Sequence, residues 1–88
     1  MRIVFRKSFT RDLKKTTDQD IRDRVRQAIE QVEAATQLQA IDDLKKLSGA
    51  ANFFRIRIGD YRIGLVVEGE TIEFVRCLPR RDLYRYFP

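Results

Sequence analysis

The stretch FFRIRIGDYRIGL, residues 53–65, alternates apolar residues with arginines on both sides of a central Gly59–Asp60 pair. Such alternation is typical of strands that bury one face, and Gly at the first of two loop positions is the signature of a type II′ hairpin turn. A two-residue loop also defines the register, in which Arg57 lies opposite Arg62. The stretch therefore predicts a β-hairpin with one apolar face and one arginine-bearing face.

The apolar face of this hairpin is expected to form the centre of the core. Its members are Phe54, Ile56, Ile58, Tyr61, Ile63 and Leu65. Glu68–Gly69 predicts a second tight turn, after which residues 71–78 form the last strand. That turn is expected to place Ile72 and Phe74 beside Leu65 and Ile63 on the same face.

The opposite face carries Arg55, Arg57 and Arg62 beside Gly64. Like charges placed directly across a ladder destabilise it by roughly 0.2–1 kcal/mol, and Gly64 would leave the backbone open to close approach. We interpret the arrangement as an anion-binding face, because two guanidinium groups can share one phosphate. The alternative is scattered surface charge, with the arginines extended into water.

The N-terminal half predicts one strand and two helices. Residues 1–5 alternate as a first strand, and Ser8 can cap a short helix after it. Thr17, followed three residues later by Asp20, begins a second helix whose apolar residues recur at helical spacing as far as Ala35.

Between the second helix and the hairpin, residues 38–47 carry Leu or Ile at every third position, which predicts a short helical turn or a packed connector. The predicted fold class is α+β: a two-layer structure with an antiparallel sheet, in the order β-α-α-β-β-β, with or without a short C-terminal helix. The two N-terminal helices pack on one face of the sheet. A chain of 88 residues forms a single domain, residues 1–88.

Composition excludes several kinds of chemistry. The chain has no His and one Cys, Cys77, so zinc sites built on His and Cys, disulfide frameworks and His-dependent catalytic triads are excluded. We expect no metal and no cofactor, and we interpret Cys77 as a packed strand residue. No apolar stretch approaches the ~20 residues that cross a bilayer, so we expect a cytosolic protein without a membrane partner.

The charge of the chain points to a polyanionic partner. Its formal net charge is +5, and all seven basic residues from position 51 onward are arginines. The tail LPRRDLYRYFP, residues 78–88, interleaves arginines with tyrosines, a pattern that can pair with phosphates while stacking on bases. In the structural alternative Leu83 and Phe87 dock on the core while the charges stay solvated, and the two interpretations are compatible.

Residues 53–63, together with PRRDLYR at residues 79–85, resemble the RelE/ParE superfamily of bacterial toxins from toxin-antitoxin pairs. Ser8–Phe9 and residues 12–15 are also similar to the start of that family, so the resemblance covers nearly the whole chain. For the RelE branch it implies a small α+β toxin that enters the ribosomal A site and cleaves mRNA by attack of a ribose 2′-OH on the adjacent phosphate.

The resemblance also implies site residues. Matched position by position, the functional residues of the branch fall on Arg55, Arg57, Arg62, Arg80 or Arg81, and Tyr84. The expected catalytic residues are Arg57, Arg62, Arg81 and Tyr84. The residues that bind RNA or phosphate are Arg55, Arg80 and Arg85.

One departure from the branch matters for the chemistry. The branch often has Lys where Arg55 and Arg57 stand, and Arg, with a pKa above ~12, is a poor proton acceptor although a good clamp on a transition state. Tyr84 is therefore the better candidate for the general base, since positive neighbours favour its phenolate form.

Three functions remain open. The arginine face and Tyr84 favour a ribosome-dependent endoribonuclease; the alternatives are a ParE-type protein that inhibits DNA gyrase without catalysis, and an inactivated toxin kept as a regulator. The expected partners are a cognate antitoxin, the ribosome and mRNA. Operator DNA is expected to be contacted only through the antitoxin complex.

Overall fold

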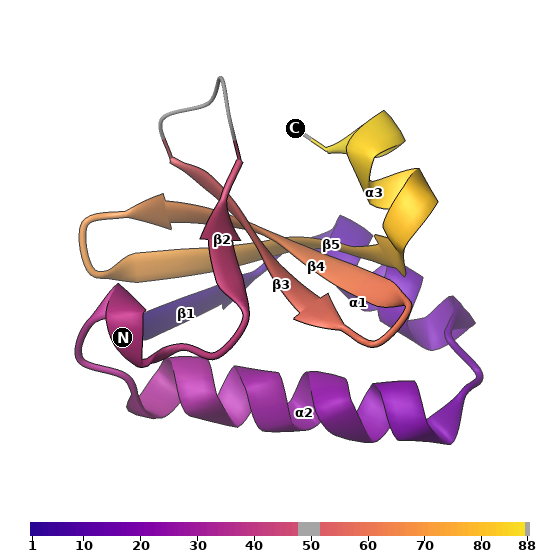
Figure 1. Ribbon diagram of the computed structural model, residues 1–88, viewed down its shortest axis with the longest axis horizontal. Helices are drawn as coiled ribbons and strands as arrows, with labels where there is room; N and C mark the ends of the chain where they lie inside the picture. Colours follow the sequence, from indigo (N-terminus) through magenta and orange to yellow (C-terminus); the bar gives the residue numbers. More distant parts are fainter. Residues whose placement is uncertain (48–51, 88) are drawn as a thin grey trace.

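The computed structural model describes residues 1–47 and 52–87 (Figure 1). The elements follow in the order β1 (Arg2–Phe5), α1 (Lys7–Lys15), α2 (Gln19–Ala34), the 3-10 turn η1 (Leu38–Ala40), β2 (Leu44–Lys46), β3 (Phe53–Ile58), β4 (Tyr61–Glu68), β5 (Thr71–Pro79) and α3 (Arg80–Tyr86). The predicted α+β class is confirmed.

The sheet is mixed, with the strand order β1-β5-β4-β3-β2. The meander β2–β5 is antiparallel as expected, whereas β1 pairs with β5 in parallel. The meander leaves the outer edge of β5 free, and the backbone groups of β1 find their partners there; nothing in the four residues of β1 encodes their direction. The helical turn predicted within residues 38–47 is η1, but the same segment also supplies the short edge strand β2, which the threefold spacing did not reveal.

The hairpin register is confirmed in full, with Ile58 opposite Tyr61, Arg57 opposite Arg62 and Phe54 opposite Leu65. Gly59 has a φ of 54°, the positive value that the first loop position of a type II′ turn requires.

The second turn lies one residue later than predicted. Gly69, with a φ of 59°, takes the first loop position, so Glu68 remains in the ladder opposite Thr71. A register shift follows between Gly64 and Leu65, where β5 carries one extra residue. Ile63 therefore pairs with Cys77 rather than lying beside Phe74, although these side chains stay on the core face.

The two predicted helix caps are wrong in detail. Ser8 does not cap α1; its hydroxyl donates to the backbone carbonyl of Val75 on β5. The cap of α2 is Asp18 rather than Thr17, because the carboxylate accepts from the backbone N–H groups of both Asp20 and Ile21, at 2.9 and 3.3 Å.

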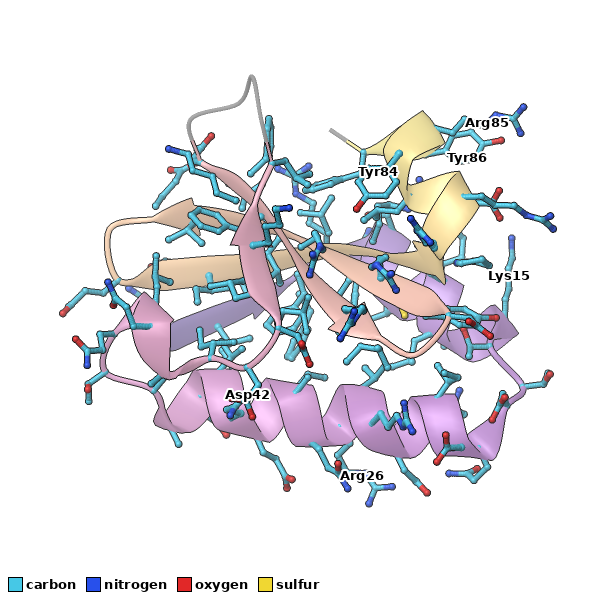
Figure 2. The ribbon with its side chains drawn as sticks, in the orientation of Figure 1. Lys15, Arg26, Asp42, Tyr84, Arg85 and Tyr86 are labelled. Atoms are coloured by element: carbon cyan, nitrogen blue, oxygen red, sulfur yellow. The ribbon has the colours of Figure 1, made fainter. Side chains whose placement is uncertain are left out.

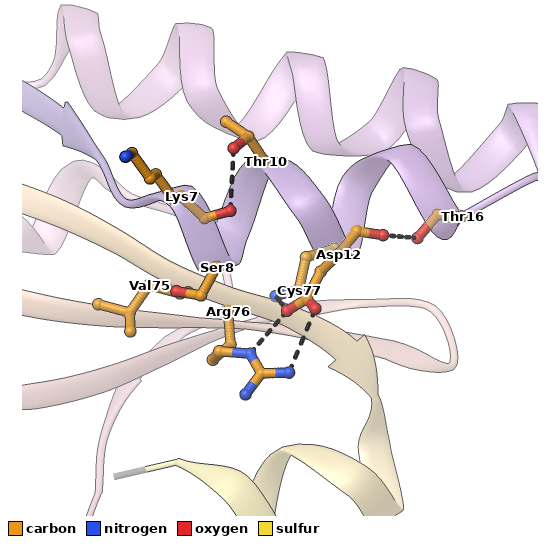
Figure 3. Close-up of polar contacts among 8 residues, drawn as sticks. All are labelled: Lys7, Ser8, Thr10, Asp12, Thr16, Val75, Arg76 and Cys77. Carbon is orange, nitrogen blue, oxygen red and sulfur yellow. Dashed lines mark hydrogen bonds and ion pairs between the residues drawn. The ribbon is translucent and has the colours of Figure 1, made fainter.

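The sheet buries apolar side chains on both faces. Helices α1 and α2 cover one face and the main core, in which Phe9, Val25 and Phe74 are fully buried. Helix α3 lies on the opposite face (Figure 3). There Leu83 and Phe87 pack on Val66 and Val75, which confirms the predicted docking of the tail and adds a partial third layer to the two expected.

Gly64 is covered by the chain itself. A Cβ at this position would lie 2.8–2.9 Å from three atoms of the Phe87 ring. The expectation that Gly64 leaves an open backbone for a ligand is therefore wrong, because the close approach that glycine permits is made by Phe87.

Asp12 joins α1 to β5 (Figure 3). Its buried carboxylate accepts from Nε and Nη2 of Arg76, at 2.7 and 3.2 Å, and from the backbone N–H of Cys77, at 3.0 Å. Removing one partner of a buried, hydrogen-bonded ion pair is strongly destabilising. We infer that this contact sets the position of α1 on the sheet.

The Gly64–Phe87 contact gives a first testable expectation. Gly64→Ala should lower the free energy of unfolding by about 1–3 kcal/mol, the usual cost of overpacking, because its methyl group overlaps the Phe87 ring. Denaturant unfolding measures the change. In a Phe87→Ala background the same substitution should cost much less, and equal costs in the two backgrounds would show that the contact is absent.

Candidate functional site

The predicted site residues come from three elements on the sheet face opposite α1 and α2. Arg55 and Arg57 lie on β3, Arg62 lies on β4, and the remaining members lie on α3. Because side chains alternate along a strand, Arg55 and Arg57 project from the same side of β3. The register places Arg62 directly across from Arg57.

Arg62 is the most buried of these arginines, with 7% of its surface exposed. Its Nη1 donates to the backbone carbonyls of Gly59 and Tyr61, each at 2.8 Å. Burial lowers the pKa of the Arg62 guanidinium, and the charges of Arg55 and Arg80 lower it further, while the Tyr84 side chain opposes the shift. Arg62 is thus a desolvated cation with two further cations and a phenol beside it.

Tyr84 reaches this cluster from α3. Leu83 and Phe87, on either side of it in the sequence, are buried against the sheet, whereas 54% of the Tyr84 surface is exposed. Figure 2 shows its ring on the side of α3 that faces the strands, with the hydroxyl directed toward them. The apolar residues of α3 therefore anchor the helix, and Tyr84 borders the arginine face.

Arg57 is exposed and has an acidic neighbour that the sequence did not reveal. Its Nη2 lies 3.6 Å from Oδ1 of Asp43. Asp43 also contacts Arg55, whose Nη1 donates to the Asp43 backbone carbonyl at 2.7 Å. Asp43 precedes the unexpected strand β2, so its position beside β3 follows from that strand pairing.

The arginines of α3 are placed differently from one another. The backbone N–H of Arg80 donates to the carbonyl of Asp60 at 2.8 Å, which ties the start of α3 to the hairpin turn. Arg81 is exposed on the first turn of the helix. Figure 2 shows Arg85 extending from the far side of α3, away from the strands. Arg55, Arg80 and Tyr84 thus lie near enough to Arg62 to act on its pKa, and Arg57 is its partner across the ladder, whereas Arg85 lies outside.

An open groove of about 710 Å³ continues from the arginine face to α2. Arg57 and Arg62 line one side of it, and Arg24 and Gln27 of α2 line the other. The guanidinium of Arg24 lies close to Gly59, since Nη1 is 3.2 Å from where a Cβ would stand there. The sequence assigned Arg24 no role, because an arginine on a mixed-charge helix face carries no local signal of what it contacts.

This constellation suits chemistry on a phosphate. Desolvated guanidinium groups stabilise charge that develops on phosphoryl oxygens, and a phenol can transfer a proton within their reach. In residues 1–47 and 52–87, no three acidic or cysteine side chains are grouped so that they could hold a metal ion. No helix in that part of the chain is both long and apolar enough to cross a membrane.

Comparisons with known proteins identify a family for the chain. Residues 3–84 match the family described as the ParE toxin of type II toxin-antitoxin systems, parDE. The chain is 43% identical over 89 residues to Toxin RelE3 of Methanocaldococcus jannaschii, covering all of both proteins. It is similar to a chain in the crystal structure of a RelB-RelE antitoxin-toxin complex from Methanococcus jannaschii, with a TM-score of 0.81 and 42% identity over 97% of this chain and 99% of that one.

A more distant likeness concerns the fold alone. The YoeB dimer from Staphylococcus aureus contains a chain with a TM-score of 0.71 and 20% identity, over 89% of this chain and 94% of that one.

Cys77 is not part of the site, which confirms its interpretation as a packed residue. It is 1% exposed, and burial, with a smaller contribution from Asp12, raises the pKa of its thiol from an ordinary 9.0 to about 12. The protonated thiol therefore stabilises the fold below pH 9, and this contribution is lost as the pH rises toward 12.

We expect Cys77 in the folded protein to resist alkylation by iodoacetamide at pH 8, because the reactive thiolate is almost absent and the sulfur is buried. Mass spectrometry of timed samples measures the reaction. The denatured protein serves as the control and should react readily, and fast labelling of the folded chain would contradict the buried position.

The geometry changes what substitutions of the two facing arginines should do. From register alone, replacing either one with Thr would relieve repulsion and stabilise the fold slightly. Arg62→Thr should instead lower the free energy of unfolding by about 1–3 kcal/mol, since it removes the donor of two backbone carbonyls. Arg57→Thr should change it by less than about 0.5 kcal/mol, because a lost exposed ion pair and a relieved repulsion nearly cancel.

Parallel denaturant titrations of the two variants measure this difference. Equal stabilisation of both would restore the repulsion argument and contradict the hydrogen bonds of Arg62.

Proposed function

This chain belongs to the family of ParE toxins of type II toxin-antitoxin systems, and we propose that it acts in the RelE manner, as an endoribonuclease that cuts mRNA on the ribosome. The chain is the toxin of such a system. The relatives at 42–43% identity over their whole length carry the RelE name, which supports the RelE branch.

One observation carries the proposal: Arg62 is buried on the sheet face toward which the Tyr84 hydroxyl points, near enough to Tyr84, Arg55 and Arg80 for each of them to act on its pKa. A protein that only occludes a larger enzyme gains nothing from burying a guanidinium among like charges beside a phenol. A phosphoryl-transfer site does gain, because groups fixed in advance stabilise the transition state without reorganising during the reaction.

The proposed reaction is an internal transfer of the phosphate. Tyr84, as the phenolate, takes the proton of a ribose 2′-OH, and the 2′ oxygen attacks the adjacent phosphorus. The bond from phosphorus to the 5′ oxygen breaks, leaving a 2′,3′-cyclic phosphate, and the departing 5′ oxygen takes a proton from water. Tyr84 then releases the proton that it accepted to the solvent. Arg57, Arg62 and Arg81 are proposed to hold the phosphoryl oxygens, while Arg55 and Arg80 bind neighbouring phosphates. Arg85, which extends from the far side of α3, would bind only a phosphate outside the arginine face.

Without His, the rate must come mainly from electrostatic stabilisation and from orientation of the substrate. The ribosome can provide that orientation by holding the message in the A site. Free RNA should therefore be a poor substrate.

We further propose that a cognate antitoxin neutralises this chain, because a similar chain forms part of a RelB-RelE antitoxin-toxin complex. The net charge of +5 suits an acidic partner segment. The ribosome and mRNA place the proposed activity in the cytoplasm, and operator DNA would be contacted only through the antitoxin complex.

A ParE-type inhibitor of DNA gyrase remains the second candidate, because the family match bears the ParE description. The two functions separate in one pair of assays. Added to a translating extract, an endonuclease of the RelE type should produce mRNA ends within translated codons, and these should disappear when ribosomes do not engage the message. Intact messages together with inhibited gyrase supercoiling would favour the ParE alternative.

Tyr84→Phe should lower the single-turnover rate of cleavage by on the order of 10²–10⁴, the usual contribution of a general acid or base. Tyr86→Phe is the matched control, because its ring belongs to the same helix but lies over Arg76, at 5.7 Å from the guanidinium carbon. Both variants should fold normally. A Tyr84→Phe variant as active as the control would show that Tyr84 only packs or stacks.

A further inference from the structure

Asp43 has an unusual backbone. Among the described residues it is the only one other than glycine with a positive φ, at 60°. This left-handed conformation is disfavoured for residues with a Cβ, although Asp tolerates it better than most. Such a conformation persists when the surrounding contacts hold it in place, and it often marks a functional site.

The contacts of Asp43 converge on the arginine face. Its backbone carbonyl accepts from Nη1 of Arg55 at 2.7 Å and from the backbone N–H of Arg57 at 3.4 Å. Its carboxylate lies 3.6 Å from Nη2 of Arg57. A single residue therefore contacts both arginines of β3, one through the main chain and the other also through the side chain.

The contact with Arg55 matters because little else is seen to hold that side chain. Its Nε is buried and has no hydrogen-bond partner among the described residues. The bond to the Asp43 carbonyl is therefore the polar contact that orients this guanidinium. Asp43 directly precedes β2, so the same carbonyl also continues the β2–β3 pairing through the backbone N–H of Arg57.

The contact with Arg57 orients the side chain without saturating it. The pair is about half exposed on both sides and longer than a close ion pair. A guanidinium has five N–H donors, so a phosphate can bind Arg57 while the contact with Asp43 persists.

We propose that Asp43 is a positioning residue, whose main-chain carbonyl and carboxylate together orient Arg55 and Arg57 toward the phosphate of the bound RNA. The inference rests on the proposed function, because the orientation of Arg55 and Arg57 matters for cleavage only if the site binds a phosphate of RNA. It assigns a role to an acidic side chain that a purely basic site would not be expected to contain.

Asp42 provides a matched control. It is the adjacent residue with the same charge, and it lines the same groove. Its backbone N–H donates to Oε1 of Gln31 on α2 at 3.0 Å, and Figure 2 shows it beside that helix. Asp42→Asn therefore makes the same change in net charge without touching either contact of Asp43 with the arginines.

Three substitutions separate the two parts of the proposal. Asp43→Gly keeps the positive φ without strain, and so keeps the carbonyl on Arg55, but it loses the carboxylate. Asp43→Ala loses the carboxylate and also strains the left-handed backbone, which should weaken the contact of the carbonyl with Arg55. Asp43→Asn tolerates the backbone and retains a side-chain oxygen that can accept from Arg57.

The first measurement needs no activity. Nitrogen-15 NMR of the arginine Nε–Hε groups in the free toxin should show a changed Arg57 signal in Asp43→Gly, and changed Arg55 and Arg57 signals in Asp43→Ala. Asp42→Asn should leave both unchanged. Unchanged signals in Asp43→Ala, with the fold intact, would overturn the proposal.

The second measurement is single-turnover cleavage on programmed ribosomes at varied toxin concentration. Asp43→Gly should cut roughly 10- to 100-fold more slowly at saturating toxin, with little change in the toxin concentration that gives half of the maximal rate. The reason is that a wrongly oriented Arg57 slows the chemical step more than it weakens binding. Asp43→Ala should lose more, Asp43→Asn should be closest to the wild type, and Asp42→Asn should match the wild type. Equal rates for Asp43→Gly and Asp42→Asn would overturn the role of the carboxylate.

If the wild type makes no cuts, the proposed function fails, and the NMR series still decides whether Asp43 holds the two arginines.

Discussion

The irregular pairing of β4 with β5 is the constraint on which the arrangement of the helices depends. Where the register shifts beside Gly64, β5 carries an extra residue, and regular pairing no longer serves every backbone group. On one face of the sheet, two side chains of α1 form hydrogen bonds with the backbone of β5. The Ser8 hydroxyl donates to the carbonyl of Val75, and the Asp12 carboxylate accepts from the N–H of Cys77. From the other face Phe87 covers Gly64. The irregular part of the β4–β5 ladder is therefore contacted by α1 on one face of the sheet and by the end of α3 on the other face.

The candidate site follows from this docking. Helix α3 has seven residues, too few to be stable in isolation, so its position depends on what its apolar side chains bury. Leu83 and Phe87 provide that burial, and they leave Tyr84 beside Arg62. The desolvation and mutual repulsion of the arginines oppose folding, which the buried clusters on the two sheet faces must outweigh.

The parts of this structure that were predictable are those with a local cause. A glycine at the first loop position and strict alternation determine the β3–β4 register, and with it the arginine face. The β4–β5 pairing was predicted wrongly because the alternation of apolar residues fits a turn at residues 68–69 as well as one at residues 69–70. The alternation also cannot reveal the extra residue that β5 carries beside Gly64. Strand β2 is only three residues long, too short to show the alternation of apolar and polar residues that would have predicted it. Asp12, Arg24 and Asp43 acquire their contacts from partners distant in sequence, so no local pattern marks them. Tyr84 could be proposed from the sequence because its basic and aromatic surroundings are themselves local.

Phe87 packs on Gly64 and thereby holds α3 so that Tyr84 faces the arginines of β3 and β4. Proton NMR of the free protein tests it most directly. If Phe87 lies over Gly64, ring currents should move at least one Gly64 Hα resonance strongly upfield, and that shift should vanish in Phe87→Leu together with the contacts between the Tyr84 ring and Arg62. An unshifted Gly64 resonance in the folded wild type, or Tyr84–Arg62 contacts that survive the loss of the ring, would contradict the account.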